Sequence, residues 1–383
     1  MPEGIRATCT ACGSAQPPGA FRCECEGVFD LPKLAATGFP KPAGGRQPSG
    51  LLRYARWIPV PERFISQITM GEGGTPLISA GGRVHLKLEY VSPTLSFKDR
   101  GAVVLVASAL DRGARTLVAD SSGNAGSALA AYASRAGLEC QVFVPAGTSA
   151  RKQAQIRAYG ASVEMVAGDR TATTEAAIAA VSETGAMYAS HIYDPLFLQG
   201  TKTFAYEVFE QLGGVPEAIV VPVGNGTLLL GAARGFRELD AAGVSSRMPA
   251  LIAVQAERCA PLATAWDQGS PAPVSVRAEP TLAEGIAIPR PARGAQILAA
   301  VADSGGCVVS VPESAITPAQ RALAGQGLFA EPTAAITWAA ALLALGHPII
   351  GGPPPGGAWK QARELAAGHL VVVPLCGSGL KAL

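Results

Sequence analysis

Charged residues, long apolar runs and an excess of either charge are scarce in this chain of 383 residues. Asp, Glu, Lys and Arg make up 16% of it, against about 25% in an average globular protein. The 31 basic and 29 acidic residues leave a formal net charge of +2, which provides no basic surface for nucleic acid or for an anionic membrane. The longest apolar run, 336–346, is too short to cross a bilayer core of about 30 Å, and the amino terminus lacks a secretory signal pattern. We therefore expect no membrane span, no nucleic-acid partner and a cytoplasmic location.

Apolar residues, glycine and proline are abundant. Hydrophobic residues make up 48% of the chain, which is enough for a sizeable core and excludes disorder as the main state. The 45 glycines and 30 prolines follow no period, which excludes a collagen-like chain. At about 150 residues per domain, the length suggests roughly two or three domains.

Four of the eight cysteines lie close together near the amino terminus. Cys9 and Cys12 form a C-x2-C pair, and ten residues later Cys23 and Cys25 form a C-x-C pair. Two such pairs supply the four thiolates of a tetrahedral zinc site, although the second pair is one residue tighter than usual. The alternatives are a zinc knuckle that has lost its metal and a group of thiols that are simply exposed. The other four cysteines are scattered, so no disulfide framework is expected.

Short apolar runs alternate with Ala-rich stretches from about residue 85 onward. Strands are predicted at 116–119, 140–145, 162–166, 218–223, 251–255, 307–311 and 369–375. Helices are predicted at 126–135, 150–159, 201–211, 228–239, 313–324 and 333–345. The strands lack polar alternation, which is typical of burial on both faces, and the βαβ rhythm predicts an α/β fold with a doubly wound, mainly parallel sheet. Ligands bind such sheets at the carboxyl ends of strands, so the turns there are the candidate sites.

A glycine-rich turn follows one predicted strand and opens a helix. It reads Gly224-Asn225-Gly226-Thr227. Glycines let backbone N–H groups face an anion, and the helix dipole favours negative charge there. The turn is a candidate phosphate site, with a purely structural tight turn as the alternative. A dinucleotide site is disfavoured because Leu229 stands where the third glycine of G-x-G-x-x-G is needed.

Three further turns carry polar or nucleophilic side chains. Asn124 lies in a glycine-lined turn, where its amide approaches a flat ligand or simply caps the helix. Lys98 falls at the start of an apolar helix, which suits imine chemistry, whereas the alternative is a surface lysine paired with Asp99. Cys376 follows the last predicted strand. It is either a thiol that faces a ligand or a small buried apolar residue. Together the four turns supply the parts of one pyridoxal phosphate (PLP) site.

The order of these turns resembles that of the fold type II PLP enzymes, and specifically that of the threonine synthases. The resemblance covers nearly the whole chain, and its most specific parts are Ser-Phe-Lys-Asp-Arg-Gly at 96–101 and Gly-Asn-Gly-Thr at 224–227. Further matching blocks, besides the N-terminal cysteine pairs, are 72–77, 87–89, 121–126, 200–203, 283–286, 331–333 and 377–381.

The resemblance also implies a domain arrangement. Two doubly wound parallel-sheet domains would hold the cofactor between them, and a small Cys-rich knuckle would precede them. The expected boundaries are 1–30 for the knuckle, 31–90 with 206–383 for the large PLP-binding domain, and 91–205 for the small domain.

Individual residues acquire roles through the same resemblance. Lys98 would bind PLP as an imine and serve as the base for the substrate's α-proton. Asn124 would hydrogen-bond the 3-oxygen of the ring, and Gly224–Thr227 would hold the 5′-phosphate. Cys376 would face the pyridine nitrogen, where threonine synthases usually carry Thr and some serine dehydratases carry Cys. The expected substrate-binding residues are Thr94, Leu95, Ser96, Ser121, Ser122, Lys152 and Asp194.

The reaction implied is the conversion of O-phosphohomoserine and water to threonine and phosphate, in a homodimer, but three departures keep other substrates open. Leu95 replaces a usual glycine. Asp194 replaces a usual asparagine and would repel a substrate phosphate unless Arg151 or Lys152 offsets it. At Cys376, a thiol, whose ordinary pKa is about 8.5, cannot hold the ring nitrogen protonated. The alternative is a serine/threonine dehydratase or a β-replacement synthase of the cysteine or cysteate type.

Overall fold

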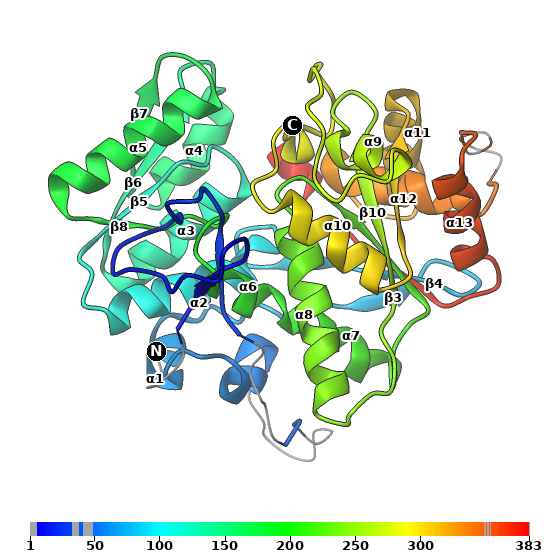
Figure 1. Cartoon of the computed structure of the whole chain (residues 1–383), viewed down its shortest axis with the longest axis horizontal. Coiled ribbons are helices and arrows are strands. Elements are labelled where there is room, and N and C mark those ends of the chain that lie inside the picture. Colours follow the sequence, from blue (N-terminus) through cyan, green and yellow to red (C-terminus); the bar gives the residue numbers. More distant parts are fainter. Residues whose placement is uncertain are drawn as a thin grey trace. The chain divides into compact units, whose positions relative to one another are not determined.

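The chain divides into two compact units in the computed structural model, which describes residues 6–32, 38–40, 49–347, 350, 352 and 354–382. Unit 1 comprises Met1–Gly74 and Ser92–Thr203, and unit 2 comprises Thr75–Val91 and Phe204–Leu383. Figure 1 labels their helices and strands and colours them along the sequence.

This division differs from the expected boundaries. Residues 31–74 were expected in the large domain but belong to unit 1, because Leu51 and Ile65 share one hydrophobic cluster with Val103 and Leu105.

Unit 1 is built on a parallel sheet with the strand order β7-β6-β5-β8. Its strands are β5 (Thr116–Ala119), β6 (Glu139–Pro145), β7 (Ser162–Val166) and β8 (Met187–Tyr188). Its helices are η1 (Gly50–Trp57), α1 (Glu62–Ile68), α2 (Lys98–Asp111), α3 (Asn124–Ala136), α4 (Ala150–Ala158), α5 (Arg170–Thr184) and α6 (Leu196–Thr201). Because the strands are parallel, the turns that follow them lie along one edge of the sheet.

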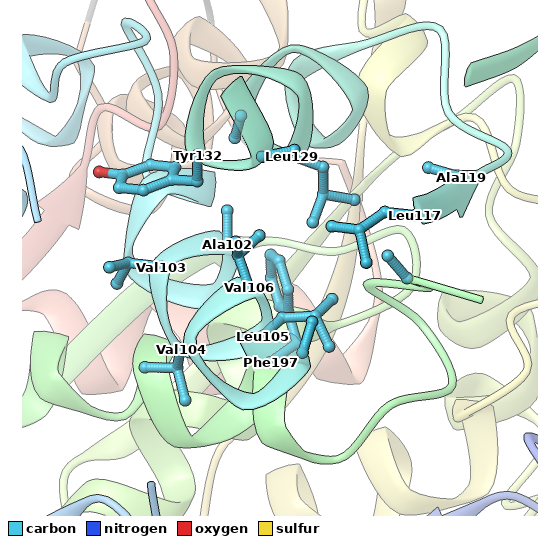
Figure 2. Packing of buried hydrophobic residues seen from close by; sticks show 14 of the residues in the cluster. Ala102, Val103, Val104, Leu105, Val106, Leu117, Ala119, Leu129, Tyr132 and Phe197 are labelled. Atoms are coloured by element: carbon cyan, nitrogen blue, oxygen red, sulfur yellow. The ribbon is translucent and has the colours of Figure 1, made fainter. Parts of the chain in front are cut away.

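Helices cover both faces of this sheet. Val142 and Val144 of β6 belong to the cluster that contains α2 and α3, whereas Phe143, which points the opposite way, packs with Ala177 of α5. Figure 2 shows the first cluster, with Phe197 of α6 beside α2.

Unit 2 is built on a larger sheet with the order β11-β10-β9-β12-β4-β3, in which only β3 is antiparallel to its neighbour. Its strands are β3 (Leu77–Ser79), β4 (Val84–Lys87), β9 (Ala218–Pro222), β10 (Ala250–Ala256), β11 (Cys307–Val311) and β12 (Val371–Pro374). Its helices are η2 (Glu89–Val91), α7 (Thr203–Leu212, whose first residue belongs to unit 1), α8 (Thr227–Ala241), α9 (Pro261–Asp267), η3 (Glu284–Ile286), α10 (Gly294–Asp303), α11 (Glu313–Ala324), α12 (Pro332–Ala344), α13 (Gly357–Ala366) and η5 (Gly379–Lys381). Every residue of β9 and β10 is buried, which confirms the interpretation of apolar runs as central strands.

All strands and helices predicted from the sequence are present, with ends that differ by at most two residues. The apolar run 336–346 forms most of α12, a buried helix of 13 residues. Within the described parts of the chain, no helix is long and apolar enough to cross a membrane. Short β8 and the weakly apolar α5 were not predicted, because two residues and a largely exposed helix carry little periodic signal.

The N-terminal knuckle, residues 6–32, belongs to unit 1 and is not an isolated domain. Its two short strands, β1 (Thr8–Cys9) and β2 (Phe29–Asp30), pair in antiparallel fashion. Ala7, Cys9 and Phe29 belong to the same hydrophobic cluster as α2. The knuckle is therefore part of the core of unit 1 (Figure 1, dark blue).

Candidate active site

Lys98 is the first residue of α2, as the sequence predicted. Asp99, which is fully buried, holds the loop before it by accepting hydrogen bonds from the backbone N–H and the hydroxyl of Thr94, at 2.7 and 2.5 Å. Lys98 is half-buried, and its Nζ lies 4.6 Å from the Phe97 ring centroid and 5.6 Å from that of Phe197. The amine lies against two aromatic faces, which does not fit the alternative of a solvated surface lysine.

Two buried hydroxyls and one strained residue precede Lys98. Among the described residues, Ser92 Oγ and Ser96 Oγ have no hydrogen-bond partner, although these serines are only 3% and 0% exposed. An unpaired buried hydroxyl costs on the order of 1–3 kcal/mol, so these are places where a ligand would supply the missing partner. Leu95 has a φ of +66°, in the left-handed region that favours glycine. This backbone geometry explains a glycine at the equivalent position of the family pattern.

Glycines set the distance between α2 and α6. A Cβ on Gly200 would lie 1.8 Å from the carbonyl oxygen of Arg100, and one on Gly101 would lie 2.4 Å from the Phe197 ring. Arg100 Nη1 also donates to Thr203 Oγ1 at 3.1 Å. The blocks 96–101 and 200–203 therefore form one packing unit that positions Lys98.

The turn after β5 carries Ser121, Ser122 and Asn124. The N-cap of α3 is Gly123, without a side-chain cap hydrogen bond, so the alternative that Asn124 is the helix cap is wrong. A Cβ on Gly126 would lie 1.8 Å from the carbonyl oxygen of Ser121. The glycine is needed because the turn brings this carbonyl onto the helix backbone. Ser121 is buried, whereas Ser122 and Asn124 are half-buried.

His191 belongs to this region but was not singled out from the sequence. It lies just after β8, which pairs with β5, so the turns after the two strands lie along the same sheet edge. The side chain is 6% exposed, and its ring centroid lies 5.8 Å from that of Phe197. Burial, together with the positive charges of Lys98 and Arg170, lowers the pKa of His191 well below its ordinary value. The imidazole is therefore neutral near pH 7. The available signal was a histidine, one of four in the chain, three residues before Asp194, which was expected at the substrate.

Asp194 lies in the same segment and is engaged locally. Its Oδ1 accepts a hydrogen bond from the Leu196 N–H at 2.9 Å, at the start of α6. An N–H at a helix start stabilises a carboxylate, so this oxygen already has a structural partner. Contact of Asp194 with the substrate stays a prediction.

Lys152 is exposed on α4. The same helix reaches the loop before Lys98, because Gln155 Nε2 donates to the Thr94 carbonyl at 3.3 Å. The assignment of Lys152 to the substrate also stays a prediction.

In unit 2, the turn after β9 has the geometry of an anion cradle. Gly226 is the N-cap of α8 with a φ of +74°, and a Cβ on it would lie 2.4 Å from Ile297. A Cβ on Gly224 would lie 2.9 Å from Ile288 and 3.0 Å from Ile286. Both glycines are therefore required by the packing, and α8 presents the N–H groups of its first turn beside them. Thr227 is buried and Asn225 half-buried in the same turn.

Other blocks of unit 2 form a layer next to this cradle. The Gly285 N–H, adjacent to Ile286, donates to Thr333 Oγ1 at 3.1 Å. The Glu331 N–H donates to the Gly377 carbonyl at 2.9 Å, and a Cβ on Gly377 would lie 2.3 Å from the Glu331 carboxylate. The resemblance to the threonine synthases includes these blocks but implies no role for them.

Cys376 lies beside this layer, two residues after β12. The residue is 2% exposed, and its Sγ lies 3.7 Å from the Pro374 carbonyl. Because β12 pairs with β9, the turns after both strands lie along the same edge of the sheet. The predicted end-of-strand location is confirmed.

The four clustered cysteines of unit 1 meet in space. Their Sγ atoms all lie within 4.8 Å of one another, with 3.5 Å between Cys9 and Cys25 and 3.5 Å between Cys12 and Cys23. A disulfide requires about 2.05 Å, whereas four sulfurs about 2.3 Å from one zinc ion are roughly 3.8 Å apart. The four sulfurs are therefore too far apart for disulfides and close enough to share one metal ion.

One further feature concerns Gly27, where a Cβ would lie 2.5 Å from Cys9 Sγ, so that glycine leaves room for this sulfur in the cluster. The pKa values of the thiols diverge. Hydrogen bonds with Ser14 lower the pKa of Cys12 to about 6, whereas the pKa of Cys25, although a hydrogen bond with Gly27 opposes the change, is raised to about 12 by the neighbouring cysteines.

Comparison with known proteins defines the class first. The family described as "Pyridoxal-phosphate dependent enzyme" matches residues 68–351. Maize serine racemase superposes with a TM-score of 0.69 at 21% identity, covering 87% of this chain and 94% of that one. The processed form of threonine deaminase isoform 2 from Solanum lycopersicum gives a TM-score of 0.67 at 22% identity, covering 91% of this chain and 90% of that one. The fold is that of the fold type II PLP enzymes.

Sequence relatives narrow the class. A threonine synthase from Methanosarcina acetivorans is 35% identical over 74% of this chain and 72% of that protein. One from Mycobacterium leprae is 32% identical over 87% of this chain and 89% of that protein. The chain belongs to the PLP-dependent enzymes and, within them, to the threonine synthase family.

Proposed function

We propose that the chain catalyses the threonine synthase reaction, in which O-phosphohomoserine and water yield threonine and phosphate. The observation that carries the proposal is the combination of family membership with a lysine at the start of α2 and a glycine cradle at the start of α8. The membership supports the substrate, and the two local geometries support the cofactor.

The residues present fit PLP. Isoleucines packed against Gly224 and Gly226 require residues without a Cβ in this turn, and the adjacent helix start favours a phosphate. In unit 1, Ser96 Oγ is buried without a partner two residues before Lys98. We assign the 5′-phosphate to Gly224–Thr227, the carbonyl-reactive amine to Lys98, and the 3-oxygen contact to Asn124.

PLP, when bound, withdraws electrons from the α-carbon of an amino acid and so makes its proton easier to remove. The Lys98 amine is the group proposed to take that proton. The Asp99–Thr94 hydrogen bonds hold the loop that carries this amine. Cys376 is proposed to meet the ring nitrogen as a neutral group.

That neutral partner supports the second candidate, a serine/threonine dehydratase. A thiol opposite the ring nitrogen leaves a weaker electron sink, which suits elimination at the β-carbon better than chemistry that needs a long-lived carbanion at the α-carbon. Asp194 adds to the case, because it places negative charge in the segment expected near a substrate phosphate.

A substrate screen separates the two candidates. Phosphate release from O-phosphohomoserine is measured beside keto-acid release from serine and threonine, with Lys98→Ala as the inactive variant. The exposed Lys360→Ala is the matched control. We expect phosphate release by the wild type and by Lys360→Ala, and none by Lys98→Ala. The Lys98→Ala variant should also lose the absorbance of lysine-bound PLP. Faster keto-acid release would favour the dehydratase, and an active, yellow Lys98→Ala would overturn both.

We also propose that Cys9, Cys12, Cys23 and Cys25 bind one Zn²⁺. The mutual Sγ distances and the space kept free at Gly27 support a tetrahedral thiolate site. Metal analysis should find about one zinc per chain, and Cys23→Ser should lose it while the buried Cys140→Ser keeps it. A zinc-free wild type contradicts this proposal.

The homodimer and the cytoplasmic location expected from the sequence stay predictions. Light scattering on the purified protein tests the first.

A further inference from the structure

The loop between Cys12 and Cys23 carries an aromatic ring that packs outside the knuckle. Phe21 lies edge-on to Tyr188, with 5.1 Å between ring centroids, and to Tyr193, with 5.6 Å. The neighbouring Arg22 guanidinium lies 5.6 Å from the centroid of the Tyr193 ring. The knuckle therefore contacts the segment that follows β8.

That segment, residues 190–194, is a tight turn, which we call the His191 turn. Ser190 Oγ accepts hydrogen bonds at 3.3 Å from the N–H groups two and three residues further along. The Ser190 carbonyl accepts another from the Asp194 N–H at 3.0 Å. These hydrogen bonds make the turn a rigid unit. The Phe21 ring, which packs on Tyr193, therefore also restrains His191.

The His191 turn is connected to the reactive amine. The His191 ring lies edge-on to Phe197, and Lys98 Nζ lies 5.6 Å from the same Phe197 ring. A series of contacts within unit 1 thus runs from Phe21 to Lys98, through the side chains of Tyr193, His191 and Phe197, with the backbone of the His191 turn as the link between Tyr193 and His191. Phe21 touches neither Lys98 nor, by its ring contacts, any residue that the family resemblance assigns to PLP or substrate.

The position of Phe21 depends on the ends of its loop. Residues 13–20 are mostly exposed, and Gly13 and Gly19 have positive φ values. Two sets of contacts restrain the path of this loop: the Gln16 N–H donates to the Ala7 carbonyl at 2.9 Å, and Cys12 and Cys23 join the cysteine cluster at its ends. A metal that ties these ends together lowers the conformational entropy of the loop.

We propose that Phe21 is a positioning residue, through which the metal-loaded knuckle holds the His191 turn in the arrangement that the amino-acid substrate requires. This inference rests on the proposed enzyme activity and, for the metal, on the proposed zinc site. It assigns the knuckle a catalytic consequence and separates it from a purely stabilising appendage.

The test compares Phe21→Ala with Phe21→Tyr and with Phe39→Ala. Phe39 is a matched control in the same unit, because its ring packs on Trp57 at 5.2 Å and on Tyr54 at 6.1 Å, away from the His191 turn. We expect Phe21→Ala to speed hydrogen exchange in residues 188–197 about tenfold, the factor that one aromatic pair is worth. The KM for the amino acid should rise about tenfold while kcat and the PLP absorbance stay within twofold. Phe21→Tyr keeps the ring and should behave as the wild type, and so should Phe39→Ala in both readouts even if it melts earlier.

Unchanged exchange in 188–197 of Phe21→Ala would overturn the proposal. A KM change of equal size in Phe39→Ala would also overturn it, because the effect would then be general destabilisation. Removal of zinc with a chelator should reproduce the Phe21→Ala exchange pattern in the wild type. A zinc-free wild type in which Phe21→Ala still acts would refute the zinc site and support the role of Phe21. A wild type inactive on every amino acid would refute the proposed activity, and the exchange experiment would still decide the positioning role.

Discussion

The two regions expected to bind PLP are built by different means. In unit 2 the cradle consists of backbone, and Gly224 and Gly226 are required because neighbouring isoleucines occupy the space of a Cβ. In unit 1 the loop before Lys98 consists of buried polar side chains, with Asp99 bonded to Thr94 and Ser96 left without a partner. An anion cradle needs backbone N–H groups that no side chain covers, and glycine provides them. A reactive amine needs a fixed position, and buried polar groups that hydrogen-bond the neighbouring loop provide it.

The largest effect is expected in the cradle. Gly226→Ala adds a Cβ 2.4 Å from the Ile297 side chain to a residue with a φ of +74°, so the buried Ile297 or the turn must shift, and we expect PLP affinity to fall at least about 100-fold, or roughly 3 kcal/mol. Gly243→Ala is the matched control, since Gly243 has a φ of +67° with nothing within 4 Å of its added Cβ. Titration of the apoenzyme with PLP measures both. Equal loss in the two variants would mean that backbone strain alone, without the cradle, explains the result.

An intermediate effect is expected at His191 and depends on pH. Burial and the charges of Lys98 and Arg170 lower the pKa of this residue in the folded state, so the unfolded chain takes up the proton first as the pH falls. The stability that depends on neutral His191 is complete above about pH 6.5 and is lost below it, at up to about 1.4 kcal/mol per pH unit. His191→Gln should therefore flatten the decline in the free energy of unfolding between pH 7 and pH 5, as measured by urea titration. The exposed His369→Gln is the control, and a wild-type slope in His191→Gln would contradict the prediction.

The smallest effect is expected at Leu95. Its left-handed conformation costs about 1–2 kcal/mol for a residue with a Cβ, whereas glycine adds up to about 1 kcal/mol of entropy to the unfolded chain. Leu95→Gly should therefore leave the free energy of unfolding unchanged or raise it by at most about 1 kcal/mol. Leu345→Gly, at a half-exposed position with an ordinary φ of −81°, should lower it by about 1 kcal/mol. If Leu95→Gly is as destabilising as Leu345→Gly, the leucine side chain stabilises the loop by more than its strain costs.

Sequence patterns predicted the glycine cradle and the lysine at a helix start because both follow from local rules. The glycine-rich turn between a buried strand and a helix is visible in the sequence, with a structural tight turn as its alternative interpretation, and Lys98 lies at the start of α2 as predicted. Asp99 was considered only as the partner of a surface lysine in the alternative interpretation, and its hydrogen bonds to Thr94, five positions away in an irregular loop, were not predicted. No periodic pattern describes such a loop.

The amino-acid sequence by itself determined the parallel α/β fold, its main strands and helices, and the family, because buried strands and glycine turns leave local patterns. Only the tertiary structure decided that the His191 ring and Lys98 Nζ both lie beside the Phe197 ring. It also decided that Leu95 is strained and that Phe21 of the knuckle packs on Tyr188 and Tyr193. These features are contacts between segments far apart in the chain, or a backbone angle that leucine seldom adopts. Both arise from packing, which no stretch of neighbouring residues encodes on its own.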